Sequence, residues 1–326
     1  MRRRVIGLTL AGLGAFLIVV AVLLRTVIGG HVVKYPLNEY FKTTLRGTGV
    51  SYFSPALVRV ARGATIQVTS TVKGDAAAGT SSTAVWNTFT YLYDTTNSVT
   101  FQYNTRRIAF DRRTAQLVEC CGASVNGNTA IRQSGLVGFL WPMGTQQTTY
   151  NVFDPVLNQP RPAHYAGTST IDGIRVYRFV EHVTHAQAGH QTLPGSLVGL
   201  PGQASVTLPE YYTGNNTFWV DPVTGGQLDV HQDQKLTLED STGTQRLLLF
   251  NGDLIMTPQS VHATVKIDRP GHNEVGLLEN VIPLVAGLVG LAALVVGIVL
   301  ARTRRDDDQP KDADAAAPQP VLDPAS

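Results

Sequence analysis

The two cysteines of this chain are neighbours, and they offer the most reactive side chains in the sequence. Cys120 and Cys121 lie in the stretch VECCGASVNG. Adjacent Cα atoms are about 3.8 Å apart across a trans peptide, whereas ordinary disulfides need about 4.4–6.8 Å. A ring between them therefore needs a distorted peptide in a turn, which Gly122 makes feasible. We predict a vicinal disulfide; two unbonded thiols, an intermolecular bridge and a bound soft metal remain open. The spacing gives no C-x-x-C redox motif.

One stretch gathers histidines. EHVTHAQAGH contains Glu181, His182, His185 and His190. Nitrogen and carboxylate ligands can bind zinc, but this spacing fits no standard site. On a strand, His182 and His185 would face opposite sides. We therefore expect surface or loop histidines, and neither a metal site nor a cofactor.

Motifs of catalysis are missing from the sequence. It contains no G-x-S-x-G elbow, no Walker-type loop, no G-x-G-x-x-G and no H-E-x-x-H. Residues 26–280 carry 18 Lys and Arg and 18 Asp and Glu, so no basic excess favours nucleic acid. We predict no catalytic residues, a protein that is not an enzyme, and no nucleic-acid partner.

Two apolar segments must hold the rest of the chain beside a membrane. Residues 5–24 and 281–301 carry no charge, and about 20 helical residues cross a hydrocarbon core of about 30 Å. Arginines flank both segments, at residues 2–4 and 302–305, and basic residues stay on the cytoplasmic side. The sequence predicts a two-pass plasma-membrane protein with both termini cytoplasmic and the main domain extracytoplasmic.

Five parts follow from this topology. They are a cytoplasmic N-terminus at 1–4, a first transmembrane helix at 5–28, an extracytoplasmic β-rich domain at 29–278, a second transmembrane helix at 279–301 and a cytoplasmic tail at 302–326. The tail lacks large apolar residues, which predicts disorder.

Small residues recur four apart in both apolar segments, and such residues let transmembrane backbones approach closely. We expect the two helices to pack against each other or against a membrane-protein partner. The residues are Gly7, Ala11 and Ala15 in the first segment, and Ala286, Gly290, Ala293, Gly297 and Ala301 in the second.

Period-two alternation dominates the segment between the anchors, which indicates half-buried strands. We therefore predict a mainly β external domain, a large twisted or barrel-like antiparallel sheet with a few short helices. One of these helices is expected at 38–47. The clearest strands are expected at 65–72, 85–94, 173–183, 227–238 and 261–268.

A short echo links two of the turns. AFDRRTAQLV (109–118) and WVDPVTGGQLDV (219–230) share a strand, an Asp, a Thr three residues later and a second strand. The side chain of an Asp that opens a tight turn can accept a hydrogen bond from the backbone N–H two residues later. Asp111 and Asp221 are therefore expected to form turns rather than to act as catalytic carboxylates.

Two apolar segments, 134–144 and 188–203, interrupt the strand pattern with Gly and Pro. Each could line a ligand pocket, form an interaction surface or fill the core. The candidate lining residues are the leucine that follows Gly135, Leu136, together with Phe139, Leu140, Trp141, Leu193, Leu197 and Leu200.

Three stretches resemble an actinobacterial family of two-anchor envelope proteins, known as DUF3068 or the porin PorA family. They are AFDRRTAQLVECCG, GLVGFLWPMGTQQTTYNVFDPVLNQPRPAHYAGTSTIDGIRVYRF and NNTFWVDPVTGGQLD. The resemblance supplies no catalytic residues. It implies motif positions that matter first for the fold: Trp141, Pro142, Gly144, Tyr150, Asp154 and Gly167.

The function implied by the word porin does not follow from these residues. A membrane barrel needs many strands of about 9–11 residues with lipid-facing alternation, whereas the spanning elements here are two helices. A pore would therefore require oligomerisation. The layout also resembles class B scavenger receptors and lysosomal lipid-handling membrane proteins, in which a tunnel through the external domain carries lipid.

We therefore predict a membrane-anchored, extracytoplasmic cell-envelope protein that binds or transfers lipid or lipid-linked glycan, with membrane lipids as partners. The alternatives are a scaffold or accessory subunit for envelope-building membrane enzymes, and a cryptic hydrolase. A hydrolase would need a concave site with converging carboxylates or histidines.

Overall fold

A computed structural model describes residues 2–25 and 33–302. The predicted disordered tail lies outside the described residues, as does the end of the first predicted transmembrane helix. The described residues form two compact units, one between residues 33 and 276 and the other made of residues 2–25 and 277–302. The first is a mainly β domain, and the second contains the apolar helices, so the predicted fold class is confirmed.

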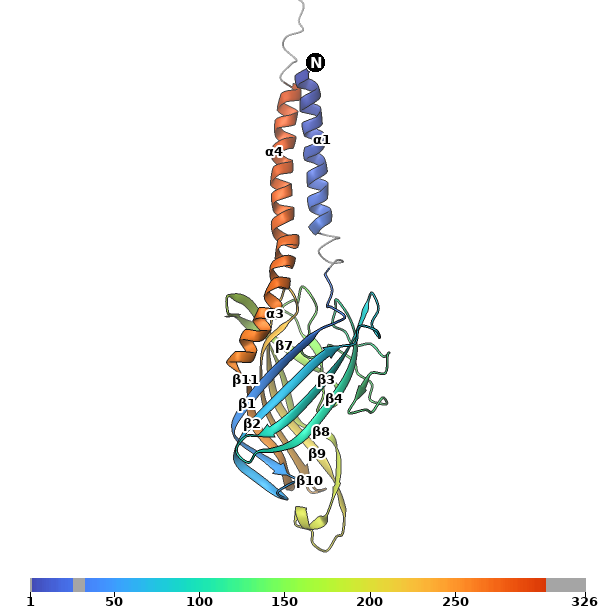
Figure 1. Cartoon of the computed structure of the whole chain (residues 1–326), viewed down its shortest axis with the longest axis vertical. Coiled ribbons are helices and arrows are strands. Elements are labelled where there is room, and N and C mark those ends of the chain that lie inside the picture. Colours follow the sequence, from blue (N-terminus) through green and yellow to red (C-terminus); the bar gives the residue numbers. More distant parts are fainter. Residues whose placement is uncertain (1, 26–32, 303–326) are drawn as a thin grey trace, which may run out of the picture. The chain divides into compact units, whose positions relative to one another are not determined.

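Eleven antiparallel strands of the described chain form one sheet, in the order β5-β4-β3-β2-β1-β11-β10-β9-β8-β7-β6. The sheet is a half-barrel: it curves so that β1–β4 and β7–β10 enclose one core (Figure 1). The pairing of β1 with β11 joins the first and last strands at the centre. The strands are β1 Tyr40–Ser54, β2 Arg59–Gly74, β3 Thr83–Asp94, β4 Val99–Asp111, β5 Ser124–Val125, β6 Tyr150–Asp154, β7 Gln159–Ile171, β8 Ile174–Leu193, β9 Val206–Val220, β10 Gln227–Glu239 and β11 Gln245–Met256.

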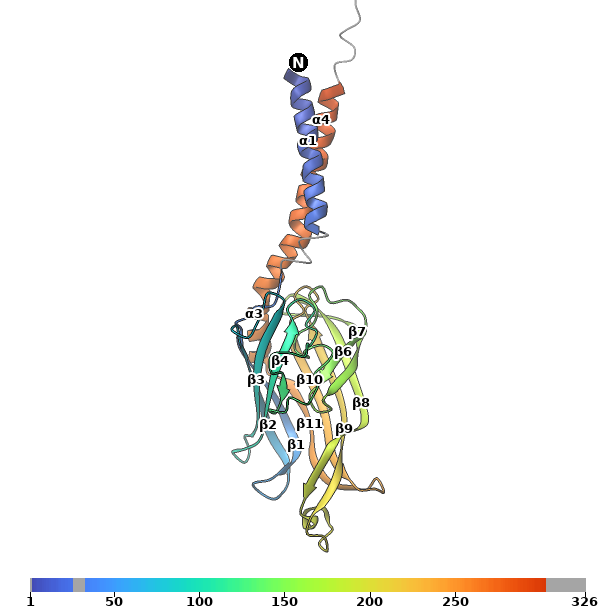
Figure 2. The same ribbon diagram turned by 90° about the vertical axis from the view of Figure 1, so that its right-hand side faces the viewer.

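The long connection between β4 and β6 lies between the two edges of the half-barrel (Figure 2). Isolated bridges join Phe110 to Leu117, Gln116 to Leu136, and Leu136 to Val152. Because these bridges run from β4 to β6, the connection covers both sheet edges and satisfies backbone groups that would otherwise be free to pair with another chain.

Five hairpins begin in the same way, with an aspartate at or just after the end of a strand. Its Oδ1 accepts a hydrogen bond from the backbone N–H two residues later, at 2.7–3.0 Å. The turn-forming roles predicted for Asp111 and Asp221 are therefore confirmed. The remaining members are Asp94, Asp154 and Asp240.

Aromatic rings fill the half-barrel. Trp141 is fully buried and stacks on Phe179, with ring centroids 4.4 Å apart. Trp86 meets Phe110 edge-on at 5.0 Å. Offset and edge-to-face pairs of this kind are the arrangements that aromatic quadrupoles favour. The rings come from both halves of the curved sheet and pack in one core.

Of residues 38–47, predicted as a short helix, those from Tyr40 onward belong instead to β1. Phe41 packs inward against Trp86, while Lys42 lies exposed on the outer side. The helical prediction was wrong because pairing with both β2 and β11 outweighs the weak local helix preference of this segment.

Residues 261–268, predicted as a strand, lie in helix α3, Pro258–Gly276. The helix starts at a proline, a residue pre-organised for the first helical position. Before it, the Thr257 hydroxyl accepts a hydrogen bond from the Ser260 N–H at 3.3 Å and caps the helix. The alternation of Val261, Val265 and their neighbours was therefore misleading, because it also fits one face of a helix.

Residues 188–193, predicted as part of a loop, extend β8 to Leu193. The 3-10 helix η2, Gly195–Val198, then leads into β9. The alternation along β8 shifts by one residue. Ile174 and Val176 are buried, as simple alternation predicts, but the next buried residue is Phe179, which stacks on Trp141, and Val180 is only half-buried.

The second unit pairs α1, Arg2–Leu23, with α4, Ile282–Arg302, which follows the π-helix η3, Leu277–Val281. Both are long and apolar enough to cross a membrane. A Cβ at Gly14 would overlap the α4 backbone near Leu294, and a Cβ at Gly297 would overlap the backbone near Ala11. The predicted close packing between the two helices is confirmed, and it depends on residues that lack a side chain.

Candidate functional site

The two cysteines occupy a turn beyond the Phe110–Leu117 bridge. Cys120 and Cys121 are joined by a disulfide, and Cys121 has a φ of 62°, in the left-handed region. Arg107 Nε donates to the Cys121 carbonyl oxygen at 2.8 Å, which ties the turn to β4. This geometry is that of a local structural clip.

The predicted histidines do not form a cluster. His182 and His190 are exposed on β8, whereas His185 stacks on Tyr211 and contacts Glu239 Oε2 at 2.9 Å. Glu181 points to the other side of the sheet and is buried. The four residues therefore share a strand but not a site.

The predicted lining residues fall into two separate groups. Leu136, Leu140 and Trp141 are buried in the main core, with Phe139 packed against it. Leu193 and Leu200 pack on a different cluster near η2, around Val198 and Leu208, and Leu197 in η2 is half-buried. The structure therefore does not bring the two segments together around one cavity.

Two open grooves lie on the surface of the described part of the chain. One, of about 450 Å³, lies along α3 and is lined by residues including His262, Lys266 and Arg269. The other, of about 440 Å³, lies between the outer side of β1–β2 and the start of α3. Neither is lined by the predicted residues, and neither is an apolar tunnel.

The family-motif positions shape the backbone or fill the core. Gly144 and Gly167 have φ values of 71° and 126°, where a side chain would be strained. The Tyr150 hydroxyl accepts a hydrogen bond from the Gln146 N–H at 2.9 Å. Trp141 fills the core, the Pro142 carbonyl oxygen accepts the Thr145 hydroxyl at 2.6 Å, and Asp154 forms a turn.

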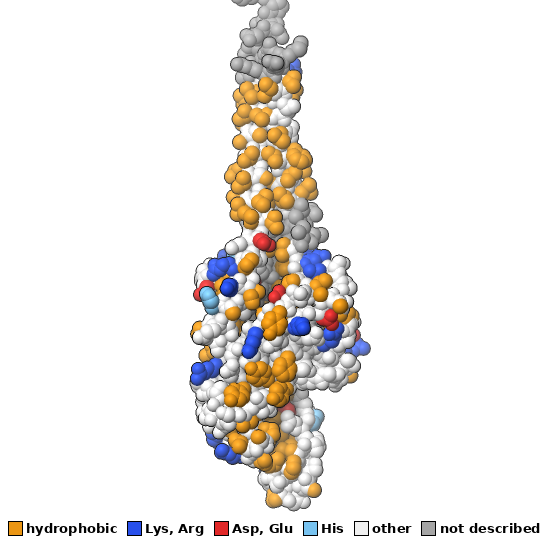
Figure 3. All heavy atoms as spheres, in the orientation of Figure 1, with side chains coloured by type: hydrophobic (Ala, Val, Ile, Leu, Met, Phe, Trp, Pro, Cys, Tyr) orange, Lys and Arg blue, Asp and Glu red, His pale blue; other side chains and the backbone are white. Residues whose placement is uncertain are grey.

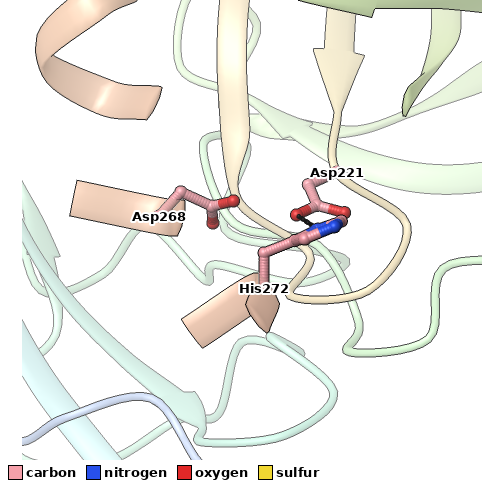
Figure 4. A group of neighbouring side chains, drawn as sticks. All are labelled: Asp221, Asp268 and His272. Carbon is pink, nitrogen blue, oxygen red and sulfur yellow. Dashed lines mark hydrogen bonds and ion pairs between the residues drawn. The ribbon is translucent and has the colours of Figure 1, made fainter. Parts of the chain in front are cut away.

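Three side chains that the sequence keeps far apart converge where α3 meets the β9–β10 turn (Figure 4). Asp268 and His272 lie four residues apart on α3, and Asp221 opens the turn. Each offers one ligand atom, and all three atoms lie within 4.8 Å of one another. His272 Nδ1 lies 2.6 Å from Asp221 Oδ2. We name Asp221, Asp268 and His272 the α3 triad.

Hydrogen bonds fix both carboxylates of the α3 triad through one oxygen. Asp221 Oδ1 accepts from the Val223 N–H at 2.8 Å, and Asp268 Oδ1 accepts from the Thr224 hydroxyl at 2.6 Å. Asp268 Oδ2 is sealed from solvent and has no hydrogen-bond partner among the described residues. Burial and the adjacent Asp221 carboxyl raise the pKa of Asp268 to about 8.

A second polar cluster lies inside the half-barrel. Asp154, Glu181 and Asn216 come from β6, β8 and β9 and are at most 4% exposed. Each has one buried oxygen without a hydrogen-bond partner in the described chain. Burial, followed by the charge of Asp154, raises the pKa of Glu181 to about 7, and burial also raises the pKa of Asp154.

The outer side of β1–β4 exposes rings. Phe89 and Tyr103 are 43% and 62% exposed, with ring centroids 6.0 Å apart in a stacked pair. Phe89 pairs across the sheet with Thr71, which pairs with Lys42, so a lysine lies in the same row. Hydrophobic and basic side chains intersperse over this face, where acidic ones are few (Figure 3). We name Lys42, Lys73, Phe89, Tyr91 and Tyr103 the outer face.

Sequence reasoning missed both carboxyl clusters. Asp221 was recognised only as a turn residue, and Asp268 was placed on a strand. The available signal was Asp268-x-x-x-His272, a spacing that puts both side chains on one side of a helix. The α3 triad also supplies the converging carboxylates and histidine that a hydrolase would need. A hydrolase would need them in a concave site, however, and none of the three residues lines either of the two grooves.

Comparison with known proteins agrees with the geometry. A sequence profile of the family described as Porin PorA matches residues 6–299. A protein named Porin PorA from Corynebacterium resistens is 24% identical over 276 residues. The match covers 65% of this chain and 67% of that protein. The family and the two apolar helices indicate a membrane protein. Since the match covers most of the chain, this protein belongs to the PorA family.

Proposed function

We propose that this protein is a non-enzymatic component of the cell envelope that binds lipid-linked glycan on the outer face of its half-barrel. The observation that carries the proposal is the exposed Phe89–Tyr103 stack, which lies in the same row of the sheet as Lys42. Sugar rings present C–H groups that pack on aromatic faces, and a lipid-linked glycan carries an anionic phosphate that lysine attracts. The packed interior favours this surface over an internal tunnel.

The proposed topology puts both termini in the cytoplasm and the half-barrel outside. Arginines flank both apolar helices on the side of the chain ends, as the positive-inside rule requires. Reporter fusions at the two termini and in the β8–β9 connection test this arrangement. Cytoplasmic signals at both ends with an external signal at the connection are expected, and any other pattern contradicts it.

The binding test uses the full-length protein in nanodiscs with a polyprenyl-phosphate-linked sugar. Phe89→Ala combined with Tyr103→Ala should weaken binding at least about tenfold, because each exposed ring contributes about 1 kcal/mol. Ile255→Ala is the matched control, since Ile255 is a 49% exposed apolar residue on β11. Equal binding by the double variant and the control would overturn the proposal. An uncharged polyprenol should bind less than the phosphate-linked sugar.

A second candidate is a channel assembled from several copies, which the family description Porin PorA and the name of the relative favour. Two helices per chain do not enclose a pore, so conduction requires an oligomer. Planar-bilayer recordings should then show discrete conductance steps from an oligomeric fraction. Conductance that is absent from every oligomeric fraction argues against this candidate.

A further inference from the structure

We propose that the α3 triad binds a divalent transition-metal ion, which joins α3 to the β9–β10 turn. The donors are one imidazole nitrogen and two carboxylate oxygens, a set that suits zinc and its neighbours in the first transition row. They come from two elements separated by more than 40 residues. The inference is independent of the proposed glycan binding.

Charge supports an ion at this place. Two carboxyl groups lie against each other, and among the described residues neither forms an ion pair with a lysine or arginine. In the described part of the chain, His272 is the one basic side chain bound to the pair. Burying two carboxylates with no more than one positive partner is costly, and a doubly charged ion between them removes that cost.

Neighbouring groups hold the two carboxylates of the α3 triad in fixed orientations. The Val223 N–H and the Thr224 hydroxyl orient the two carboxylates through Oδ1, in the way that outer hydrogen bonds orient metal ligands. The remaining oxygen of Asp268 is buried and has no partner in the described chain, and the remaining oxygen of Asp221 faces His272. Asp268 thus offers an unpartnered oxygen, and an ion would take the place of the proton shared between His272 and Asp221.

Space supports the same conclusion. A tetrahedral ion with bonds of about 2.1 Å separates its ligands by about 3.4 Å, and the three atoms lie within 4.8 Å of one another. The 2.6 Å separation between His272 Nδ1 and Asp221 Oδ2 must widen and any longer separation must shorten, by about 1 Å, to reach this spacing. Gly226 contributes because a Cβ there would overlap Asp268 Oδ1, so a larger residue would push this carboxylate away.

Three protein ligands leave a fourth coordination position. His272 is 28% exposed, so water can reach the ion from its side. An ion held in this way would serve as a cross-link between two elements, in addition to the hydrogen bond between Thr224 and Asp268. Binding of an ion to the folded state alone stabilises that state by mass action.

The experiment uses the full-length protein in detergent, stripped with chelator, dialysed and titrated with Zn²⁺. We expect about one Zn²⁺ per chain and a rise in the unfolding temperature. Asp268→Asn and His272→Gln should each lower Zn²⁺ affinity at least about 100-fold, because even outer partners of metal ligands contribute 10–100-fold. His262→Gln, an exposed histidine of the same helix that contacts Asp172, should retain Zn²⁺.

Cobalt gives a readout that does not depend on stability. Co²⁺ at this set should give visible absorption bands that change in His272→Gln and not in His262→Gln. If the triad instead holds a shared proton, Asp268→Asn keeps the wild-type unfolding temperature and no variant changes metal content. That result, or less than about 0.2 Zn²⁺ per wild-type chain, overturns the proposal.

Discussion

Asn216 donates a hydrogen bond of 3.0 Å from its side-chain amide to Glu181 Oε2, inside the half-barrel. Both residues are nearly inaccessible to solvent, and they face each other because Glu181 on β8 pairs directly with Asn216 on β9. The carboxyl group is therefore held in a place where its ionised form is poorly solvated. A stability dependence on pH follows from this pair.

The first prediction concerns Glu181, whose pKa rises from 4.5 to about 7 on folding. Between these values the folded state binds more protons than the unfolded state, so the free energy of unfolding falls as pH rises, by about 3 kcal/mol in all. Glu181→Gln should remove most of this slope and increase stability at pH 8. Denaturant titrations of the full-length protein at several pH values measure it.

Glu274→Gln, an exposed glutamate on α3, is the matched control for that experiment. It should keep the wild-type slope. A Glu181→Gln protein whose stability still falls steeply between pH 5 and 7 would assign the effect to other groups.

The second prediction concerns Gly225 in the β9–β10 turn, which has a φ of 76° and lies against the Trp141 carbonyl oxygen. Gly225→Ala adds a Cβ that overlaps this oxygen and should cost about 3 kcal/mol or prevent folding. Gly243→Ala is the comparison, because Gly243 has a φ of 78° but open space around it. That change should cost only about 1 kcal/mol. Equal losses of stability in the two variants would show that the strain of a positive φ accounts for the whole effect and that overlap with Trp141 adds nothing.

The third prediction concerns the contact between α1 and α4. Gly14→Leu places a side chain against the backbone of Gly290 and Leu294 and should separate the helices. Gly12→Leu changes the same helix where nothing lies within 4 Å, and it should be tolerated. Cysteine cross-linking between the two helices, in a protein without Cys120 and Cys121, compares the variants. Undiminished cross-linking in Gly14→Leu would be incompatible with this packing.

The fourth prediction concerns Cys120 and Cys121, which form a disulfide in a turn. Thiol titration of the denatured, unreduced chain should find no reactive thiol, and titration after reduction should find two. Two reactive thiols before reduction would rule out the ring. Non-reducing electrophoresis distinguishes the ring within one chain from an intermolecular disulfide, because an intermolecular disulfide gives dimers.

The sequence by itself determined the features that depend on local periodicity. Two uncharged runs of about 20 residues specify helices that can cross a membrane, since length and composition alone decide that property. Alternation specified the strands around 65–72, 85–94, 173–183 and 227–238, and an aspartate at a strand end specified turns such as those at Asp111 and Asp221. These signals are read correctly because each is contained within a few neighbouring residues.

Tertiary structure decided the features that depend on distant partners. Residues 40–47 became a strand because β2 and β11 supplied hydrogen bonds on both sides. The segment 261–268 lies in a helix whose Val265 packs against Ile174, Val176 and Leu228. Only the folded chain places Asp221 beside Asp268 and His272, or Glu181 beside Asn216. No local pattern records such pairs, because their distance is set by the register and curvature of a sheet whose first and last strands are neighbours.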